Sequence, residues 1–272
     1  MMKNDDGLDI NRLDPHLIKA GLTITEIANF LLEEFFRRSE SSVAARIIAG
    51  VIARSIRTTT SIVVLCNNND VQGAWILHRT LVERLFHLAH LGSTDSYLEF
   101  EKWSFFEQAK RAQKSLGDPL FRDRTKGPAY QLSPREKERF STMQRDPPKW
   151  RRGKAEDMAK HLGLKFLYDY AYDYASMHIH PMANDGDLDL LMPAQQARYC
   201  QEIELATGNS LLALTLVLQE AMNSPPVKWA KVAYDMVDAA RAYIRDPSSD
   251  YLTPFKLSAR LRDSNGLSAL AG

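Results

Sequence analysis

Apolar residues recur at intervals of three and four along almost the whole chain, and we find no segment that alternates apolar and polar residues between hairpin turns. Intervals of three and four place apolar side chains on one face of a helix, whereas strict alternation is typical of a half-buried strand. The chain has 272 residues, 44% of them hydrophobic, which is enough for a sizeable core. The sequence therefore predicts an all-α fold, a multi-helix up-and-down bundle of about seven to eight helices.

Capping and helix-breaking residues set the expected helix boundaries. Asp14-Pro15 starts the first helix, and the turn Asn67–Asp70 separates two long antiparallel helices. The expected helices cover about 14–38, 42–66, 71–91, 95–116, 133–142, 154–162 with its continuation 166–180, 194–222 and 225–245. Five prolines make 117–153 an irregular, basic insertion. We expect a single domain over 1–245, with a motif-bearing core at about 47–181, and a C-terminal tail over 246–272.

Basic residues gather in one part of a chain whose net charge is only +1. From Arg122 to Lys154 there are eleven Lys or Arg residues against four Asp or Glu. Two interpretations remain open: a solvated loop, or a patch that contacts phosphates and stacks aromatic rings on bases. The candidate nucleic-acid contacts are Arg122, Arg124, Lys126, Lys149, Trp150, Arg151 and Arg152.

Several common classes of protein find no support in the sequence. Cys66 and Cys200 match no zinc spacing, and the N-terminus lacks the pattern of a signal peptide, so we expect free thiols and a cytoplasmic location. Val43–Cys66 is long enough to cross a bilayer, but three arginines interrupt it, and we expect no transmembrane helix. No glycine-rich phosphate loop or nucleotide fingerprint occurs, so we expect no cofactor.

Two expected helices each carry a stripe of polar residues beside an apolar face. Arg79 and Glu83 form the first polar stripe, at the border of the apolar arc of helix 71–91. The second polar stripe lies within about 60° of helix 166–180 and contains Asp169, Asp173, Ser176 and His180. Because burying an unpaired charge is costly, the two stripes are expected to face each other across the bundle. Alternatively, Arg79 and Glu83 form a surface pair, and the second stripe is an exposed acidic face.

Other side chains of these two helices are expected to pack in the core. His78 falls in the middle of the first apolar arc, which favours a neutral, hydrogen-bonded core histidine. On the second helix, the apolar arc contains Phe166, Tyr170 and Met177, and His178 is expected to pack against Tyr174.

The second stripe suggests general acid/base chemistry. His180 would transfer protons, Arg79 would stabilise negative charge on a phosphate, and Ser176 would position the substrate or act as a nucleophile. The Glu-x-x-His pattern of di-metal bundles is absent, and no metal is expected.

Two motifs carry a resemblance to a known family. They are Arg79-Thr-Leu-Val-Glu83 and Tyr172-x-x-x-Ser176-x-x-x-His180. They resemble the R-[ST]-L-x-E and Y…S-x-x-x-H helices of a bacterial all-helical family catalogued as a domain of unknown function. That family is similar in layout to HEPN-type helical bundles, many of which are RNA-cleaving toxins or phage-defence effectors. The Arg-x4–6-His signature of those bundles occurs here only as Arg84-x5-His90, so the arginine acting with His180 would have to be Arg79.

This resemblance implies a homodimer that acts on RNA without a metal or a membrane. Its catalytic residues would be His180, Arg79, Glu83 and Ser176, with Asp169, Asp173 and Tyr172 as polar neighbours. Two alternatives stay open: a non-catalytic scaffold with a buried Arg-Glu-Ser-His network, and a bundle that binds a small ligand or a metal.

Overall fold

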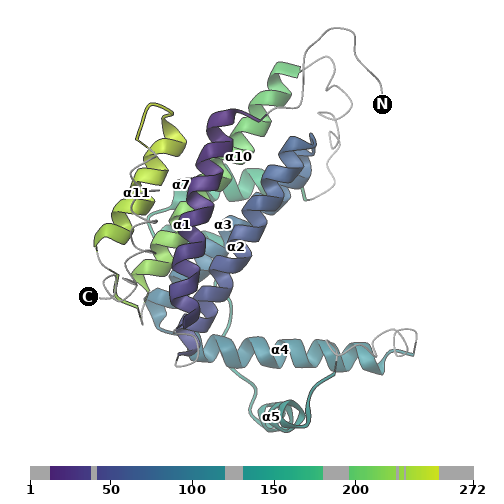
Figure 1. Cartoon of the computed structure of the whole chain (residues 1–272). Helices are drawn as coiled ribbons and strands as arrows, with labels where there is room; N and C mark the ends of the chain where they lie inside the picture. Colours follow the sequence, from purple (N-terminus) through teal and green to yellow (C-terminus); the bar gives the residue numbers. More distant parts are fainter. Residues whose placement is uncertain are drawn as a thin grey trace.

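Most of the described part of the chain is helical. The computed structural model describes residues 13–37, 42–119, 131–179, 196–224, 227–229 and 231–250, and no β-strand occurs among them. The bundle consists of α1 (Pro15–Arg37), α2 (Val43–Asn67), α3 (Val71–Thr94), α10 (Gln196–Asn223) and α11 (Lys231–Arg245), which run side by side (Figure 1). The all-α prediction is therefore confirmed.

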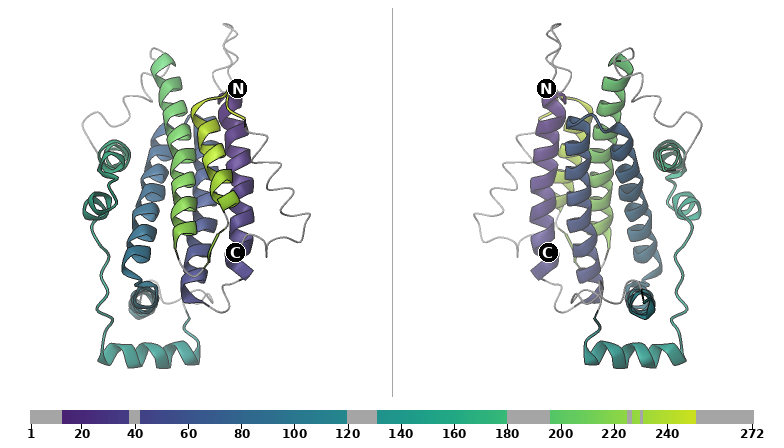
Figure 2. Two further views of the ribbon diagram at one scale, coloured as in Figure 1. Left: turned by 90° about the vertical axis from the view of Figure 1, so that its left-hand side faces the viewer. Right: turned by 90° about the vertical axis from the view of Figure 1, so that its right-hand side faces the viewer.

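The centre of the bundle is formed by α2, α3 and α10, which pack closely on one another, while α1 and α11 cover them on one side (Figure 2). Their contact faces are fully buried at Ile52, Leu85 and Leu214. α2 is long and apolar enough to cross a membrane by length and composition, despite its three arginines, and no other helix among the described residues is. A core helix of a bundle has the same composition, so this is weak evidence for a span.

The expected boundary of α3 is wrong by three residues. Helix 71–91 was expected to end before Gly92, but α3 continues to Thr94. The hydroxyls of Ser93 and Thr94 donate to the carbonyl of His90 at 3.0 and 2.7 Å, as helical serine and threonine often do. The helix ends at Asp95, whose left-handed backbone (φ 46°) stops it.

α4 (Tyr97–Gly117) and α5 (Pro134–Arg145) depart from the expected up-and-down order. α4 lies across one end of the bundle, and α5 packs on α4 (Figure 1). Arg139 of α5 forms two hydrogen bonds of 2.9 and 2.6 Å to Glu101, and Phe140 is buried beside Phe106. We call α4 and α5 together the arm; the up-and-down prediction holds for the other long helices only.

After the arm, the chain returns to the side of α3. Pro147–Lys154, which we call the strap, leads into α6 (Ala155–His161), and α7 (Lys165–Leu167), the π-helix η2 (Tyr168–Asp173) and α8 (Tyr174–Ser176) follow. α6, η2 and α8 all pack on α3. The strap thus brings the two predicted polar stripes to the same side of the bundle.

Candidate functional site

Arg79 of α3 reaches across to η2 and α8. Its Nε donates to Ser176 Oγ at 2.8 Å, and its Nη2 donates to Tyr172 Oη at 2.7 Å. The guanidinium carbon also lies 4.5 Å from the centre of the Tyr172 ring, a cation–π distance. The structure therefore brings Arg79 and Ser176 of the two predicted stripes into contact, together with Tyr172.

The hydroxyl of Ser176 is engaged on both sides. It accepts from Arg79, and it donates its own proton to the carbonyl of Tyr172 at 2.7 Å. A serine nucleophile must instead give its proton to a base such as histidine. This arrangement fits the positioning role expected for Ser176 and not the nucleophilic one.

The π-helical geometry of η2 determines which of its side chains face α3. A turn of π-helix contains more residues than a turn of α-helix. The side chains within and after η2 therefore point in other directions than a regular α-helix would give them. Ala171, Tyr172 and Ala175 are buried, and their small or flat side chains let the segment approach α3 closely.

Two expectations about this segment are wrong for the same reason. Asp169 and Asp173 do not share the buried face of Ser176: both are exposed, as the alternative of an exposed acidic face expected, and Asp169 pairs with Lys165 at 2.6 Å. The residues that were expected in the apolar inner arc are also exposed, namely Phe166, Tyr170 and Met177 at 58, 80 and 51%. The angular projection assumed a regular α-helix, which this segment is not.

Glu83 is held by the strap and not by Arg79. Its carboxylate pairs with Arg152, and the two side chains are 23% and 46% exposed. The predicted pair of Arg79 with Glu83 is therefore wrong, although both lie close enough to Tyr172 to act on its pKa. Burial and Glu83 raise the pKa of Tyr172, and Arg79 and Arg152 oppose that shift. The phenol therefore stays protonated at neutral pH.

The charges around Tyr172 do not balance. Among the described residues whose charges act on Tyr172, Arg79 and Arg152 are cationic and Glu83, which pairs with Arg152, is the one carboxylate. Among the described residues no carboxylate forms an ion pair with Arg79, whose partners are neutral hydroxyls. The described residues of the site thus carry one excess positive charge, on a half-buried guanidinium, which suits an anionic ligand.

His87 and Trp150 attach the strap to α3. The His87 ring lies edge-on to Phe100 at 4.7 Å and stacks with Trp150 at 5.6 Å, and Trp103 completes the cluster at 4.9 Å from Trp150. Burial, helped by Arg152 and His90, lowers the pKa of His87 to about 4. His87 is therefore neutral at pH 7, and the ring of Trp150 packs within the fold instead of standing free to stack on a base.

The remaining predicted site residues are either exposed on the strap or outside the described residues. Lys149, Arg151 and Arg152 are exposed on the strap. Arg122, Arg124, Lys126 and His180 lie outside the described residues, so their predicted roles stay predictions.

Glu202 of α10 supports the site, and sequence reasoning missed it. Its carboxylate accepts from Trp75 Nε1 at 3.1 Å and from Tyr174 Oη at 3.2 Å. This contact links α8 to α10, in addition to the link from Ser176 to Arg79 of α3. No spacing in the sequence relates positions 75, 174 and 202, because three separate helices carry them.

The two histidines expected to pack in the fold do so. His78 is fully buried, its Nδ1 lies 3.0 Å from Ser210 Oγ, and burial lowers its pKa to about 4. His178 packs edge-on against Tyr174 at 5.5 Å and stacks on Trp75 at 6.4 Å. In the described part of the chain, no three His, Cys, Asp or Glu side chains are grouped so that they could hold a metal ion.

Comparison with known proteins gives one match. No curated protein and no solved structure matches the chain. A family model described as "Family of unknown function (DUF5677)" matches residues 45–192, which is more than half of the chain. The matched range includes both motifs that carry the resemblance, Arg79–Glu83 and Tyr172–His180. The chain therefore belongs to DUF5677, a family of unknown function.

Proposed function

We propose that this protein acts on RNA as a HEPN-like helical bundle and cleaves it without a metal, as toxins and phage-defence effectors of that type do. A phosphodiester would bind at Arg79 and Arg152, and His180 would act as the general acid/base. One observation carries the proposal: the guanidinium of Arg79 is half-buried and has no carboxylate partner among the described residues.

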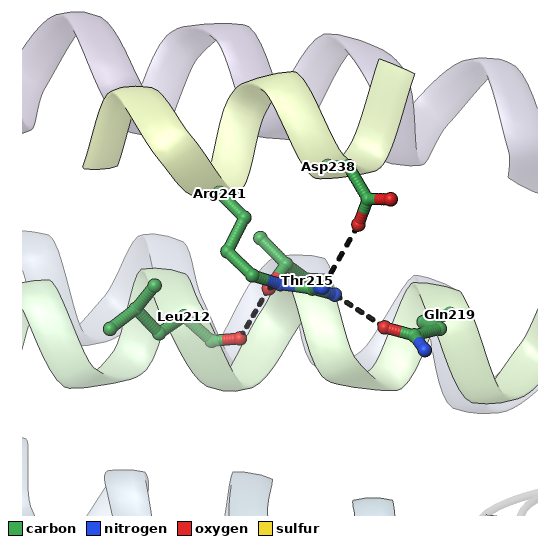
Figure 3. A network of polar contacts seen from close by, with 5 residues as sticks. All are labelled: Leu212, Thr215, Gln219, Asp238 and Arg241. Carbon is green, nitrogen blue, oxygen red and sulfur yellow. Dashed lines mark hydrogen bonds and ion pairs between the residues drawn. The ribbon is translucent and has the colours of Figure 1, made fainter. Parts of the chain in front are cut away.

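Arg241 shows what a half-buried arginine looks like when the protein itself neutralises it. Its guanidinium donates to Asp238 at 3.0 Å, to Gln219 at 2.6 Å and to Thr215 at 3.1 Å (Figure 3). Removing charge from water without a counter-charge is expensive, so a half-buried arginine without a carboxylate partner is stabilised when an anion binds to it. Arg79 differs from Arg241 in this respect.

The geometry suits a phosphate. Two of the five N–H donors of Arg79 bind Ser176 and Tyr172, which fix the plane of the guanidinium. The other donors can bind phosphate oxygens and stabilise the charge that develops on them during cleavage. Glu83 orients Arg152 at the same place, so we assign Glu83 a positioning role.

The alternative function is a non-catalytic scaffold, and one observation favours it. The bonds from Arg79 to Ser176 and from Ser176 to the Tyr172 carbonyl lock α8 onto α3. In that case Arg79 would fix the packing of these helices and bind nothing further.

Cleavage of a labelled single-stranded RNA in EDTA tests the proposal. We expect wild-type protein to cleave, and Arg79→Met and His180→Ala to lose about 100-fold or more in rate, the usual effect of removing one charge-stabilising donor or acid/base. Arg241→Met is the matched control, since it also removes a half-buried, hydrogen-bonded arginine, and it should cleave within a few-fold of wild type. Thermal unfolding shows that each variant is folded.

The scaffold alternative makes the opposite prediction. Wild-type protein would neither bind nor cleave RNA, and Arg79→Met would lower the melting temperature at least as much as Arg241→Met does. Equal loss of cleavage in both arginine variants would also contradict a role for Arg79 in the reaction.

A further inference from the structure

A cavity lies next to the Arg79 site. It has a volume of about 320 Å³ and lies between the last turn of α3 and α6, beside the end of the strap. Met158 and Leu162 give it an apolar wall, while His90, Lys154, Asp157 and His161 line it with polar groups. Ligand pockets in proteins combine these two kinds of surface.

The polar groups of this cavity are available to a ligand. Among the described residues, the side chains of His90, Lys154, Asp157 and His161 form no hydrogen bond or ion pair. Asp157 offers an acceptor, Lys154 offers a donor, and the imidazole rings offer flat faces as well as nitrogen atoms. Together they can recognise a flat, polar heterocycle.

The cavity and the Arg79 site share one face of α3. His90 follows Glu83 by seven residues, which is two helical turns and about 10 Å along the axis. The strap joins the two places: Arg152 pairs with Glu83, and a side chain at the next residue, Gly153, would lie within 3.3 Å of Met158. One extended strand can therefore reach both.

We propose that this cavity binds one base of the RNA strand whose phosphate lies at Arg79. The proposal rests on the proposed function and adds to it how the strand is held. The volume is at the lower end of the range for ligand pockets, about 300 Å³, so it admits a single ring system. Bases of single-stranded RNA stack on histidine and aliphatic side chains and bind side chains through their polar edges.

The test compares two non-cleavable 2′-O-methyl RNA octamers, one with its bases and one without them, for binding to the protein. Fluorescence anisotropy would be measured for wild type and for Ser93→Trp, which puts a large side chain into the cavity from the exposed last turn of α3. Ser61→Trp is the matched control, because Ser61 is also exposed and also bonds to the carbonyl one turn earlier. Stacking of one base changes affinity by about 5- to 150-fold.

We expect wild type and Ser61→Trp to prefer the octamer with bases, and Ser93→Trp to lose that preference while it binds the base-free octamer as wild type does. Equal affinity of wild type for both octamers would overturn the cavity proposal and leave RNA binding intact. If wild type binds neither octamer, the proposed function fails. Titration with free adenosine and cytidine then tests whether the cavity binds a base. Nucleoside binding that Ser93→Trp abolishes would then support it, and no binding would overturn it.

Discussion

His78 and His87 are both neutral because the fold removes them from water. Ser210 Oγ donates to the Ala206 carbonyl at 2.6 Å, so it accepts from His78, whose Nδ1 must carry the proton. His87 lies between aromatic rings and near Arg152, which also disfavours a charge. Burial lowers the pKa of each histidine from 6.5 to about 4.

This shift makes the stability of the protein depend on pH. An unfolded histidine binds a proton near pH 6.5, and these two in the folded state bind one only near pH 4, so the free energy of unfolding falls as the pH drops between those values. At pH 5 each histidine accounts for a loss of about 2 kcal/mol. Urea unfolding at pH 7 and pH 5 measures this loss. In His87→Phe the free energy of unfolding should differ between the two pH values by about 2 kcal/mol less than in wild type.

The decisive quantity is the difference between wild type and His87→Phe in the loss of stability from pH 7 to pH 5. Burial raises the pKa of Glu220, which changes stability with pH in the opposite direction and affects wild type and variant alike. If His87→Phe shows the same loss between pH 7 and pH 5 as wild type, His87 is not buried as a neutral ring.

Among the elements, the regular helix α3 could be predicted down to the face on which its core and polar side chains lie, and η2 could not. In α3 the helical projection placed His78 in the core and Arg79 and Glu83 at its border, as found. In η2 the π-turn shifted the register, so Asp169 and Asp173 were placed wrongly.

The partners of the site residues were also beyond helical projection. Arg152 lies 69 residues after Glu83 in the sequence, and only the return of the strap brings them together. The same holds for Glu202 with Trp75 and Tyr174. A sequence periodicity reports the face of one helix, whereas a contact between elements depends on how the chain is routed between them.

α5 should open independently of the rest of the protein. α5 packs mainly on α4, and Phe140 is its one fully buried side chain among the described residues. Phe140→Ala removes a buried ring, a change that costs about 3–5 kcal/mol in a core, and here it should release α5 alone. We expect trypsin to cut within 134–145 about tenfold faster or more, while the melting temperature of the bundle changes little.

Phe106→Ala serves as a second test of the same contact, since its ring faces Phe140 at 5.4 Å. Both variants should accelerate cleavage in α5. A large fall in the melting temperature of the whole protein would show instead that the arm and the bundle unfold together.

At the scale of the whole molecule, the range matched by the family is not a complete folding unit. Residues 45–192 contain nearly all of α2 and the whole of α3 but none of α1, α10 or α11, and α10 packs directly on both α2 and α3. Without α10 a large apolar surface of α2 and α3 would face water. The all-α class was predictable from periodicity, while this division of the core among distant segments was not.

A fragment of residues 45–192 should therefore fail to fold by itself. We expect it to aggregate or to unfold without a cooperative thermal transition, while a chain of residues 13–250 melts in one step. Circular dichroism during heating and size-exclusion chromatography measure both properties. A monomeric fragment with a sharp transition would contradict this account of the core.

The place of α10 in the core also has a consequence for synthesis on the ribosome. About 100 residues separate the end of α3 from the start of α10, and at 5–20 residues per second they take roughly 5 to 20 s to be made. During that time the α2–α3 hairpin waits for its main partner with its apolar face uncovered. The nascent chain is thus a natural client for chaperones, and a pause in translation within the arm or the strap would prolong the period in which it can aggregate.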